Sequence, residues 1–206
     1  MSKAILVLAI LVSGFTQAQG QFEKGMGSAF KLWGEGKNTE ASAMFERIAS
    51  AEKTSWLPNY YVALVNTITA FGTKDKETIN ALLTNALTAL DIEMIKDQKN
   101  AELYVMQAMI YTAWIVYDPM VNGMKLSGPT MEMYTKAEML APKYPRVVFS
   151  KADFPINGAR YTGVDTRPLC SEVERSIGLF APFQPETAFS QKWGLARARE
   201  PYKHSK

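Results

Sequence analysis

The chain has 206 residues, 23 lysines and arginines against 20 aspartates and glutamates, and a formal net charge of +3. This near balance excludes the strongly basic surface that is typical of nucleic-acid-binding proteins, so we expect no nucleic-acid partner. With one cysteine, Cys170, and one histidine, His204, the chain has neither an internal disulfide nor the ligands of a structural zinc site.

Residues 1–18 have the pattern of a secretory signal peptide. A basic start is followed by an apolar run, and Thr16 and Ala18 are the small residues that a signal peptidase reads. The run of about ten residues is too short for a stable transmembrane helix, which needs about 20. Phe15 stands where a bacterial lipoprotein would carry its lipidated cysteine. We therefore predict a cleaved leader, no lipid anchor and no stable insertion in the membrane.

Removal of these residues leaves residues 19–206, a length that fits a single domain. The predicted leader places this domain in the periplasm or outside the cell. Without disulfides, such a protein must derive its stability from its hydrophobic core.

Apolar residues at helical spacing follow the predicted cleavage site, and turn residues divide them into hairpins. Gly36 ends the first pattern where a helix favours a left-handed residue, and Asn38, Ser55 and Asp75 are placed to cap the next three helices. The expected inward residues of these four helices are, in order, Phe22, Met26, Ala29, Phe30 and Trp33; Ala41, Met44, Phe45 and Ile48; Trp56, Tyr60, Leu64, Ile68 and Phe71; and Ile79, Leu82, Leu83, Ala86, Leu87 and Leu90.

The fifth pattern, which starts at Asn100 or Asp97, is apolar nearly all round. We therefore expect it to be the central helix, with Trp114 largely buried. Asp118 and Pro119 are expected to end it, and residues 118–129 are expected to form a loop insertion before a sixth helix.

The two helices around this insertion resemble those of a tetratricopeptide (TPR) repeat. The resemblance depends on residue types and offsets at Tyr104, Ala108, Tyr111, Tyr134, Ala137 and Pro142. A TPR hairpin cannot bury its apolar face alone and stacks on its neighbours. The resemblance implies an all-α fold of stacked helical hairpins, with three to four hairpins in the chain.

The C-terminal third is expected to contain two more helices and an extended end. A helix is predicted from Arg146 to about Asp153, followed by an irregular segment over residues 154–165 that contains Pro155 and Asn157-Gly158. An eighth helix should carry Leu169, Val173, Ile177 and Phe180 inward. Beyond Pro182 the chain is expected to be extended, with Trp193-Gly194 docking it on the body.

A second resemblance covers nearly the whole predicted mature chain, namely to exported TPR-like proteins of Bacteroidota that have no established activity. Its motifs are Asp118-Pro119-Met120, Gly123, Lys125, Gly128, Ala141-Pro142, Pro145-Arg146-Val147 and Trp193-Gly194. The chain departs from the group between Phe154 and Gly163. The resemblance implies a TPR-like fold and a periplasmic address, and it supplies no catalytic residues.

The sequence gives no positive sign of catalysis, a metal site or a cofactor. His204 lies in the tail, and Cys170 in an amphipathic helix fits packing better than a reactive thiol. Seven of the eleven methionines fall between Met106 and Met139, and thioethers bind Cu(I) in oxidising compartments. Methionine also fills irregular gaps between stacked helices, which is the interpretation we favour.

The composition and the TPR resemblance together favour a non-enzymatic exported scaffold that binds a protein or peptide partner. The candidate partner-binding residues are four groove positions and three positions of the expected loop: Glu102, Val105, Met109, Thr112, Asp118, Asn122 and Lys125. Two alternatives remain open at this point. One is a small-ligand or metal carrier that uses the methionine- and aromatic-rich centre, and the other is an enzyme whose residues converge only in space. The sequence does not indicate an oligomeric state.

Overall fold

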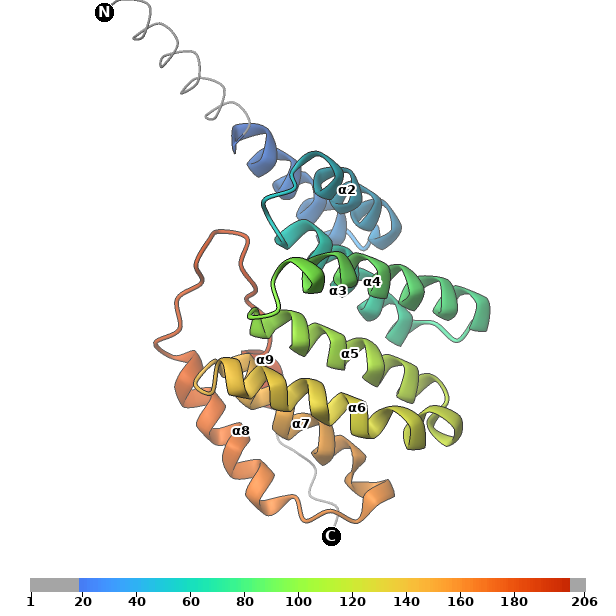
Figure 1. Cartoon of the computed structure of the whole chain (residues 1–206), viewed down its shortest axis with the longest axis vertical. Helices are drawn as coiled ribbons and strands as arrows, with labels where there is room; N and C mark the ends of the chain where they lie inside the picture. The colour runs from blue at the N-terminus through green and yellow to red at the C-terminus, as the bar shows by residue number, and fades with distance from the viewer. Residues whose placement is uncertain (1–18, 201–206) are drawn as a thin grey trace, which may run out of the picture.

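The computed structural model describes residues 19–200, which fold into helices and connecting segments without a β-strand (Figure 1). Within this part of the chain a first helix covers residues 19–34. The following helices are α2 (Asn38–Ala51), α3 (Leu57–Gly72), α4 (Lys76–Lys96), α5 (Ala101–Tyr117), α6 (Pro119–Leu140), α7 (Pro145–Thr162), α8 (Arg167–Phe180) and α9 (Leu195–Ala198). The predicted all-α class is confirmed. The predicted signal peptide and His204 lie outside the described residues.

The helices pack as successive hairpins. The pairs α3 and α4, α5 and α6, and α7 and α8 are antiparallel neighbours, and α2 packs against α3 and α4 against α5. The first helices of successive hairpins also lie beside one another, since α5 contacts both α3 and α7. This is the stacked arrangement of a TPR-like fold, in which the first helices form one continuous face.

Local sequence explains where several of these helices begin. The side chain of Asp75 accepts a hydrogen bond from the backbone of Thr78, so the predicted cap of α4 is confirmed. The side chain of Asn100 accepts one from the backbone of Glu102, so of the two predicted starts of α5 Asn100 is confirmed, whereas Asp97 instead ends α4. The expected caps at Asn38 and Ser55 are wrong, because α2 and α3 have Lys37 and Trp56 at that position and no side-chain cap.

The largest core cluster surrounds α3, which is buried along most of its length. Alanines with no exposed surface let helices approach closely at Ala41, Ala63, Ala86, Ala108 and Ala137. Aromatic rings from the first two hairpins fill the space between them. Phe30, Phe45 and Tyr61 lie 4.6 to 5.4 Å apart from centroid to centroid, so the N-terminal half has a packed aromatic centre.

The predicted loop over residues 118–129 is wrong, because this segment is the first half of α6. The Asp118 side chain accepts from the backbone N–H of Val121 at 3.1 Å, and Pro119 occupies the first helical position. These residues therefore start a helix directly after α5. Pro129 lies inside α6, where it removes one backbone hydrogen bond. The remaining turns of α6 stabilise the helix enough for it to continue through Pro129.

The expected irregular segment 154–165 is also largely helical, since α7 continues through Pro155 to Thr162. The side chain of Asn157 donates to the carbonyl oxygen of Asp153 at 2.7 Å, which is a bond within a helix rather than within a turn. Gly163 then ends α7 with a positive φ of 69°. Only the short connection to α8 is irregular.

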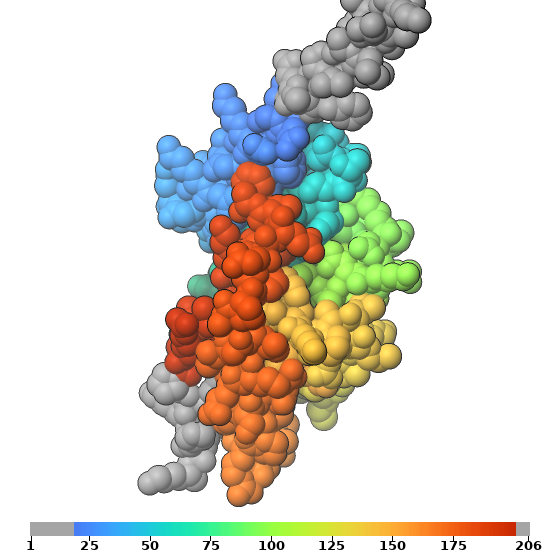
Figure 2. All heavy atoms as spheres, turned by 90° about the vertical axis from the view of Figure 1, so that its left-hand side faces the viewer, coloured from blue at the N-terminus to red at the C-terminus, as the bar shows by residue number. Residues whose placement is uncertain are grey.

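Residues 181–194 form a strap that leaves α8 and returns along the stack to α9. Figure 2 shows it on one side of the molecule, extending from the C-terminal helices to the N-terminal ones. The indole N–H of Trp193 donates to the hydroxyl of Tyr60 at 2.9 Å, and the hydroxyl of Tyr61 donates to the carbonyl of Phe189 at 2.7 Å. The predicted docking of Trp193 on the body is confirmed.

Candidate functional site

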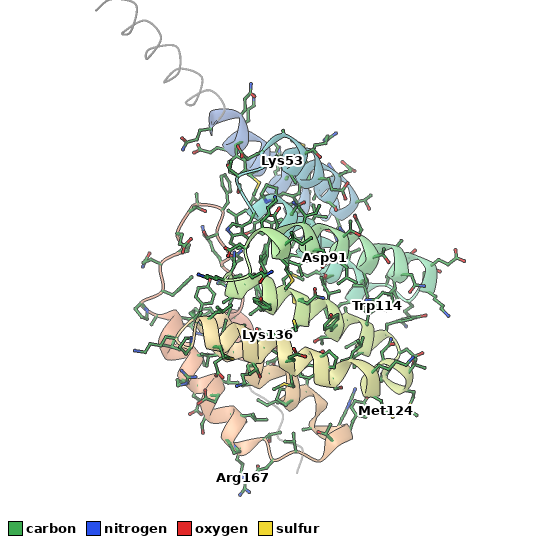
Figure 3. The ribbon with its side chains drawn as sticks, in the orientation of Figure 1. Lys53, Asp91, Trp114, Met124, Lys136 and Arg167 are labelled. Carbon is green, nitrogen blue, oxygen red and sulfur yellow. The ribbon has the colours of Figure 1, made fainter. Side chains whose placement is uncertain are left out.

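One end of the helical stack, where α3 turns into α4 and α5 turns into α6, carries exposed apolar side chains. Of the twelve large apolar side chains that are exposed in the described residues, five lie here, and we call them the turn-end patch: Phe71, Val116, Met120, Val121 and Met124. Met124 is 90% exposed and Met120 is 84% exposed. Figure 3 places Trp114 and Met124 at this end, away from Lys136. Such a concentration of apolar surface is typical of a binding site.

A notch of about 220 Å³ opens in the turn-end patch between the ends of α3 and α5 and the start of α4. It is lined by Ala70, Phe71, Thr73, Lys74, Ile79, Ala113, Val116 and Tyr117. The alanines bring the two helices together, while the rings of Phe71 and Tyr117 form walls. Phe71, expected to face the core, is instead 42% exposed, because α3 ends before another helix covers it.

Two lysines flank this apolar surface. Lys74 lines the notch, and Lys125 follows Met124 on α6. None of the ion pairs among the described residues includes either lysine. The end of the stack therefore combines aromatic and thioether surface with two cations that are available to an anionic group.

The three candidate residues of the expected loop lie close to this patch, but two of them have structural roles. Asp118 caps α6, and the side-chain amide of Asn122 donates to the carbonyl of Trp114 at 2.7 Å. Both fix α6 against the end of α5. Lys125 is exposed. Trp114 is half-buried rather than largely buried, and its ring lies 6.4 Å from that of Tyr117.

The four expected groove positions on α5 do not form an open surface. Glu102 and Val105 are only 4% and 1% exposed, so their predicted contact with a partner is wrong for this structure. Met109 and Thr112 are half-buried, and the Thr112 hydroxyl donates to the carbonyl of Ala108 in its own helix. The expectation failed because neighbouring helices and the strap cover the side of α5 that was assigned to the groove.

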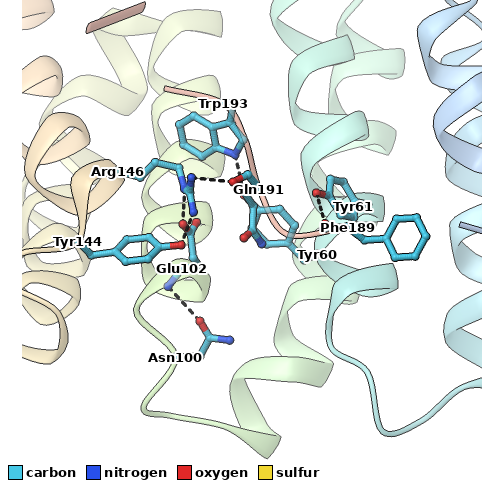
Figure 4. Close-up of polar contacts among 9 residues, drawn as sticks. All are labelled: Tyr60, Tyr61, Asn100, Glu102, Tyr144, Arg146, Phe189, Gln191 and Trp193. Carbon is cyan, nitrogen blue, oxygen red and sulfur yellow. Dashed lines mark hydrogen bonds and ion pairs between the residues drawn. The ribbon is translucent and has the colours of Figure 1, made fainter. Parts of the chain in front are cut away.

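A buried polar cluster lies at the opposite end of the same helices (Figure 4). Arg146, at the start of α7, has no exposed surface. Its guanidinium donates to Oε1 of Glu102, to the hydroxyl of Tyr144, and to the carbonyl of Gln191 at 2.9 Å. The rings of Tyr144, Phe183 and Trp193 surround it, with their centroids 4.8, 5.1 and 5.8 Å from its central carbon. The cluster connects α5, α7 and the strap.

Burial raises the pKa of the Glu102 carboxyl, although the charge of Arg146 acts in the opposite direction. Burial also raises the pKa of Tyr60 and of Tyr144 well above their usual range, so both phenols stay protonated and serve as donors or acceptors. Oε2 of Glu102 and Nε2 of Gln191 have no hydrogen-bond partner in the structure. Glu102, Arg146 and Gln191 are all buried, so the role that we assign to the cluster is to hold the strap.

Sequence reasoning did not find this cluster, although two signals were present. Glu102 is a carboxylate in a helix that is apolar nearly all round, and Arg146 stands beside two valines. A charged residue in an apolar environment is seldom buried without a partner of opposite charge. The two signals lie 44 residues apart, and only the packing of α5 against α7 brings them together.

A second, shallow hollow of about 470 Å³ lies where the strap leaves α8. Its walls are Ala141, Pro142, Lys143, Tyr144, Pro145, Leu179, Pro182 and Phe183. Among the described residues no group of three or more histidine, cysteine, aspartate and glutamate side chains is placed to hold a metal ion. Cys170 is half-buried in the first turn of α8. In the described part of the chain, no helix combines the length and apolar character needed to cross a bilayer.

Comparison of the sequence finds no matching protein family and no matching curated protein. Two solved structures have a similar fold. The HusA haemophore from Porphyromonas gingivalis superposes with a TM-score of 0.74 and 22% identity, over 86% of this chain and 88% of that chain. A TPR protein of Thermus thermophilus superposes with a TM-score of 0.60 and 14% identity, over 77% of this chain and 74% of that chain. These likenesses show that the chain has a TPR-like fold that HusA shares.

Proposed function

We propose that this protein is an exported, non-enzymatic carrier of a small flat ligand, and that the ligand is haem or a related tetrapyrrole. The observation that carries the proposal is the similarity to the HusA haemophore along almost the full length of both chains. It favours the small-ligand carrier over the protein or peptide scaffold. The turn-end patch is the site that we assign to this ligand.

The chemistry of the turn-end patch suits an amphipathic tetrapyrrole. Apolar surface contributes roughly 25 cal/mol for each Å² removed from water, so a flat macrocycle gains most by covering exposed side chains such as Met120, Met124 and Val116. Phe71 and Tyr117 add aromatic surface at the notch. Lys74 and Lys125 supply cations for the carboxylates at the edge of the ligand.

The turn-end patch also contains side chains of a type that coordinates haem iron. The thioethers of Met120 and Met124 belong to a class of ligand that haem iron accepts in proteins. The apolar contacts with the macrocycle and the ionic contacts between the two lysines and the ligand's carboxylates do not require iron. We therefore expect metal-free protoporphyrin to bind at the same place as haem.

The experiment is a titration of the purified chain with haem and with protoporphyrin, followed by absorbance and by quenching of tryptophan fluorescence. Two variants, Val116→Asp and Met124→Asp, place a carboxylate on the turn-end patch at exposed positions, where the fold tolerates it. The matched control is Met139→Asp, an 80% exposed methionine at the other end of α6.

We expect each patch variant to weaken binding at least tenfold and the control to bind as the unchanged chain does. Failure of the unchanged chain to bind either tetrapyrrole would overturn the proposed function. Unchanged binding in both patch variants, or a loss in Met139→Asp as large as theirs, would show that the turn-end patch is not the ligand site.

A further inference from the structure

The apolar surface of the turn-end patch continues onto a third hairpin turn, where α7 ends and α8 begins. Tyr161 is 68% exposed there and Val164 is 42% exposed. Because α5 lies beside both α3 and α7, the turns that follow these three helices are neighbours, and Figure 1 shows them along one edge of the stack. We call the residues of the three turns, 71–77, 116–125 and 160–167, the turn row. It contains seven of the twelve exposed large apolar side chains in the described part of the chain.

Outside the notch at Phe71, the turn row presents its apolar groups as projecting tips. Met120 and Met124 of α6 are 84% and 90% exposed, and the ring of Tyr161 projects from the last turn of α7. A protein interface gains most of its free energy in well packed, enclosed pockets. Projecting aliphatic and aromatic side chains instead suit the boundary between the headgroups and the acyl chains of a bilayer, where tyrosine rings are enriched.

The cations of the turn row stand among these tips and are complementary to anionic lipid. Lys74, Lys76, Lys125 and Arg160 are exposed. None of the four belongs to an ion pair among residues 19–200. Each lysine or arginine near an anionic membrane surface adds to the attraction, so four of them give this edge a preference for such a surface.

Three of the four acidic residues of the turn row interact within the protein. Asp75 and Asp118 accept backbone N–H groups at the starts of α4 and α6, and Asp165 pairs with Arg167. The fourth, Glu77, lies in the first turn of α4, where a carboxylate is favoured by the helix dipole. The acidic groups of the turn row therefore complement helix starts and one arginine, and they leave the four cations to an external partner.

The opposite end of the stack has an exposed apolar side chain in a different electrostatic environment. Ile95, in the last turn of α4, is 80% exposed. Asp91 lies four residues earlier on the same side of the helix, and Asp97 ends it. An anionic surface repels both carboxylates, so Ile95 offers a control position with similar exposure and opposite local charge.

We propose that the turn row docks the protein on the surface of a bilayer that contains anionic phospholipids, with its apolar tips among the headgroups and its cations against the phosphates. The contact is peripheral, because no helix in the described part of the chain is long and apolar enough to cross a bilayer. Docking does not require the proposed ligand, and it holds the turn-end patch at the lipid surface. The third turn lies outside that patch, so substitutions there test docking separately.

The test is co-sedimentation of the purified chain with vesicles of phosphatidylcholine and phosphatidylglycerol, and with vesicles of phosphatidylcholine alone. We expect binding to the anionic vesicles that weakens at high salt, and much weaker binding to the neutral ones. Tyr161→Asp and Val164→Asp each add a negative charge to the row and should weaken binding about fivefold or more. Ile95→Asp, the matched control, should bind as the unchanged chain does. A haem titration of these three variants should give unchanged affinity, which separates docking from the ligand site.

A charge pair and a tryptophan pair identify the surface that faces the lipid. Arg160→Gln should weaken binding about fivefold, whereas Lys53→Gln, an exposed lysine between α2 and α3, should change nothing. Tryptophan placed at Tyr161 should be quenched by phospholipids with brominated acyl chains, and tryptophan placed at Ile95 should not. Failure of the unchanged chain to bind anionic vesicles would overturn the proposal and leave a protein surface as the partner of the turn row. Equal losses in Tyr161→Asp and Ile95→Asp, or equal quenching at the two positions, would also overturn it.

Discussion

The guanidinium of Arg146 and the carboxylate of Glu102 form an ion pair in which neither side chain has more than 5% exposed surface. The pair joins the first helices of two successive hairpins, α7 and α5. Through Gln191 the same guanidinium fixes the strap, whose Phe189 reaches the first hairpin. Residues near the two ends of the chain are thus connected, whereas an open helical solenoid connects only neighbouring repeats.

Replacement of Arg146 by alanine should destabilise the protein severely. Removal of one partner of a buried ion pair leaves the other charge uncompensated and typically costs about 3–5 kcal/mol. The measurement is the free energy of unfolding from urea denaturation. Lys143→Ala, an exposed lysine three residues earlier, is the control and should change this free energy by less than about 0.5 kcal/mol. Equal effects of the two substitutions would show that the cluster does not hold the fold together.

Glu102 should make the stability depend on pH in a defined direction. Because burial raises its pKa in the folded state, the folded chain binds more protons than the unfolded chain in the range just above the ordinary glutamate value of 4.5. The contribution of this group is therefore greatest below that value and is lost as the pH rises through the folded pKa.

Urea denaturation at a series of pH values from 4 to 7, for the unchanged chain and for Glu102→Gln, measures this contribution. The stability of the unchanged chain relative to the variant should fall as the pH rises. Glu174→Gln, at an exposed position of α8, should show no such trend. A relative stability that rises with pH would mean that Arg146 outweighs burial and lowers the Glu102 pKa.

Two glycine substitutions should have opposite effects on stability. Gly194 has a positive φ of 108°, and a Cβ there would lie 2.8 Å from the ring of Phe180 and 3.2 Å from Cγ of Arg146. We expect Gly194→Ala to cost at least about 1–3 kcal/mol. Gly178, inside α8, has open space around an added Cβ, so Gly178→Ala should stabilise by about 0.5–1 kcal/mol. Melting temperatures that shift in the same direction for both variants would contradict the expected close packing at Gly194 or the open space at Gly178.

Periodicity and turn residues are sufficient to predict the helical class and the hairpin order, because each helix buries a stripe that repeats with the helical period. The segments where prediction fails contain proline or glycine inside a helix. Pro129 and Pro155 indicate breaks in the sequence pattern, yet both lie within helices whose neighbouring turns supply enough packing and hydrogen bonds. Prediction from local proline and glycine residues therefore underestimates helix length where packing against neighbouring helices stabilises the longer helix.

The candidate site was predictable only in part. The methionine- and aromatic-rich region of the sequence does include Met120, Met124 and Tyr117, which lie at the turn-end patch. The exposure of Phe71 was not predictable, because its spacing fits the buried face of α3 and only the end of the stack leaves it uncovered. Likewise, the sequence pattern of α5 predicted an accessible Glu102. The pattern of one helix does not reveal that a strap about 80 to 90 residues later in the chain packs over it.

The proposed ligand site should respond to the charge of Lys74. Exposed ion pairs contribute about 0.2–1 kcal/mol, so Lys74→Ala should weaken the binding of haem by up to about fivefold, with a smaller effect at high salt. Lys143→Ala, at the second hollow, is the matched control and should bind haem as the unchanged chain does. The dimethyl ester of protoporphyrin lacks free carboxylates, and its affinity should be the same for the unchanged chain and for Lys74→Ala. If the substitution weakens the ester and the free acid equally, Lys74 acts through the shape of the notch and not through its charge.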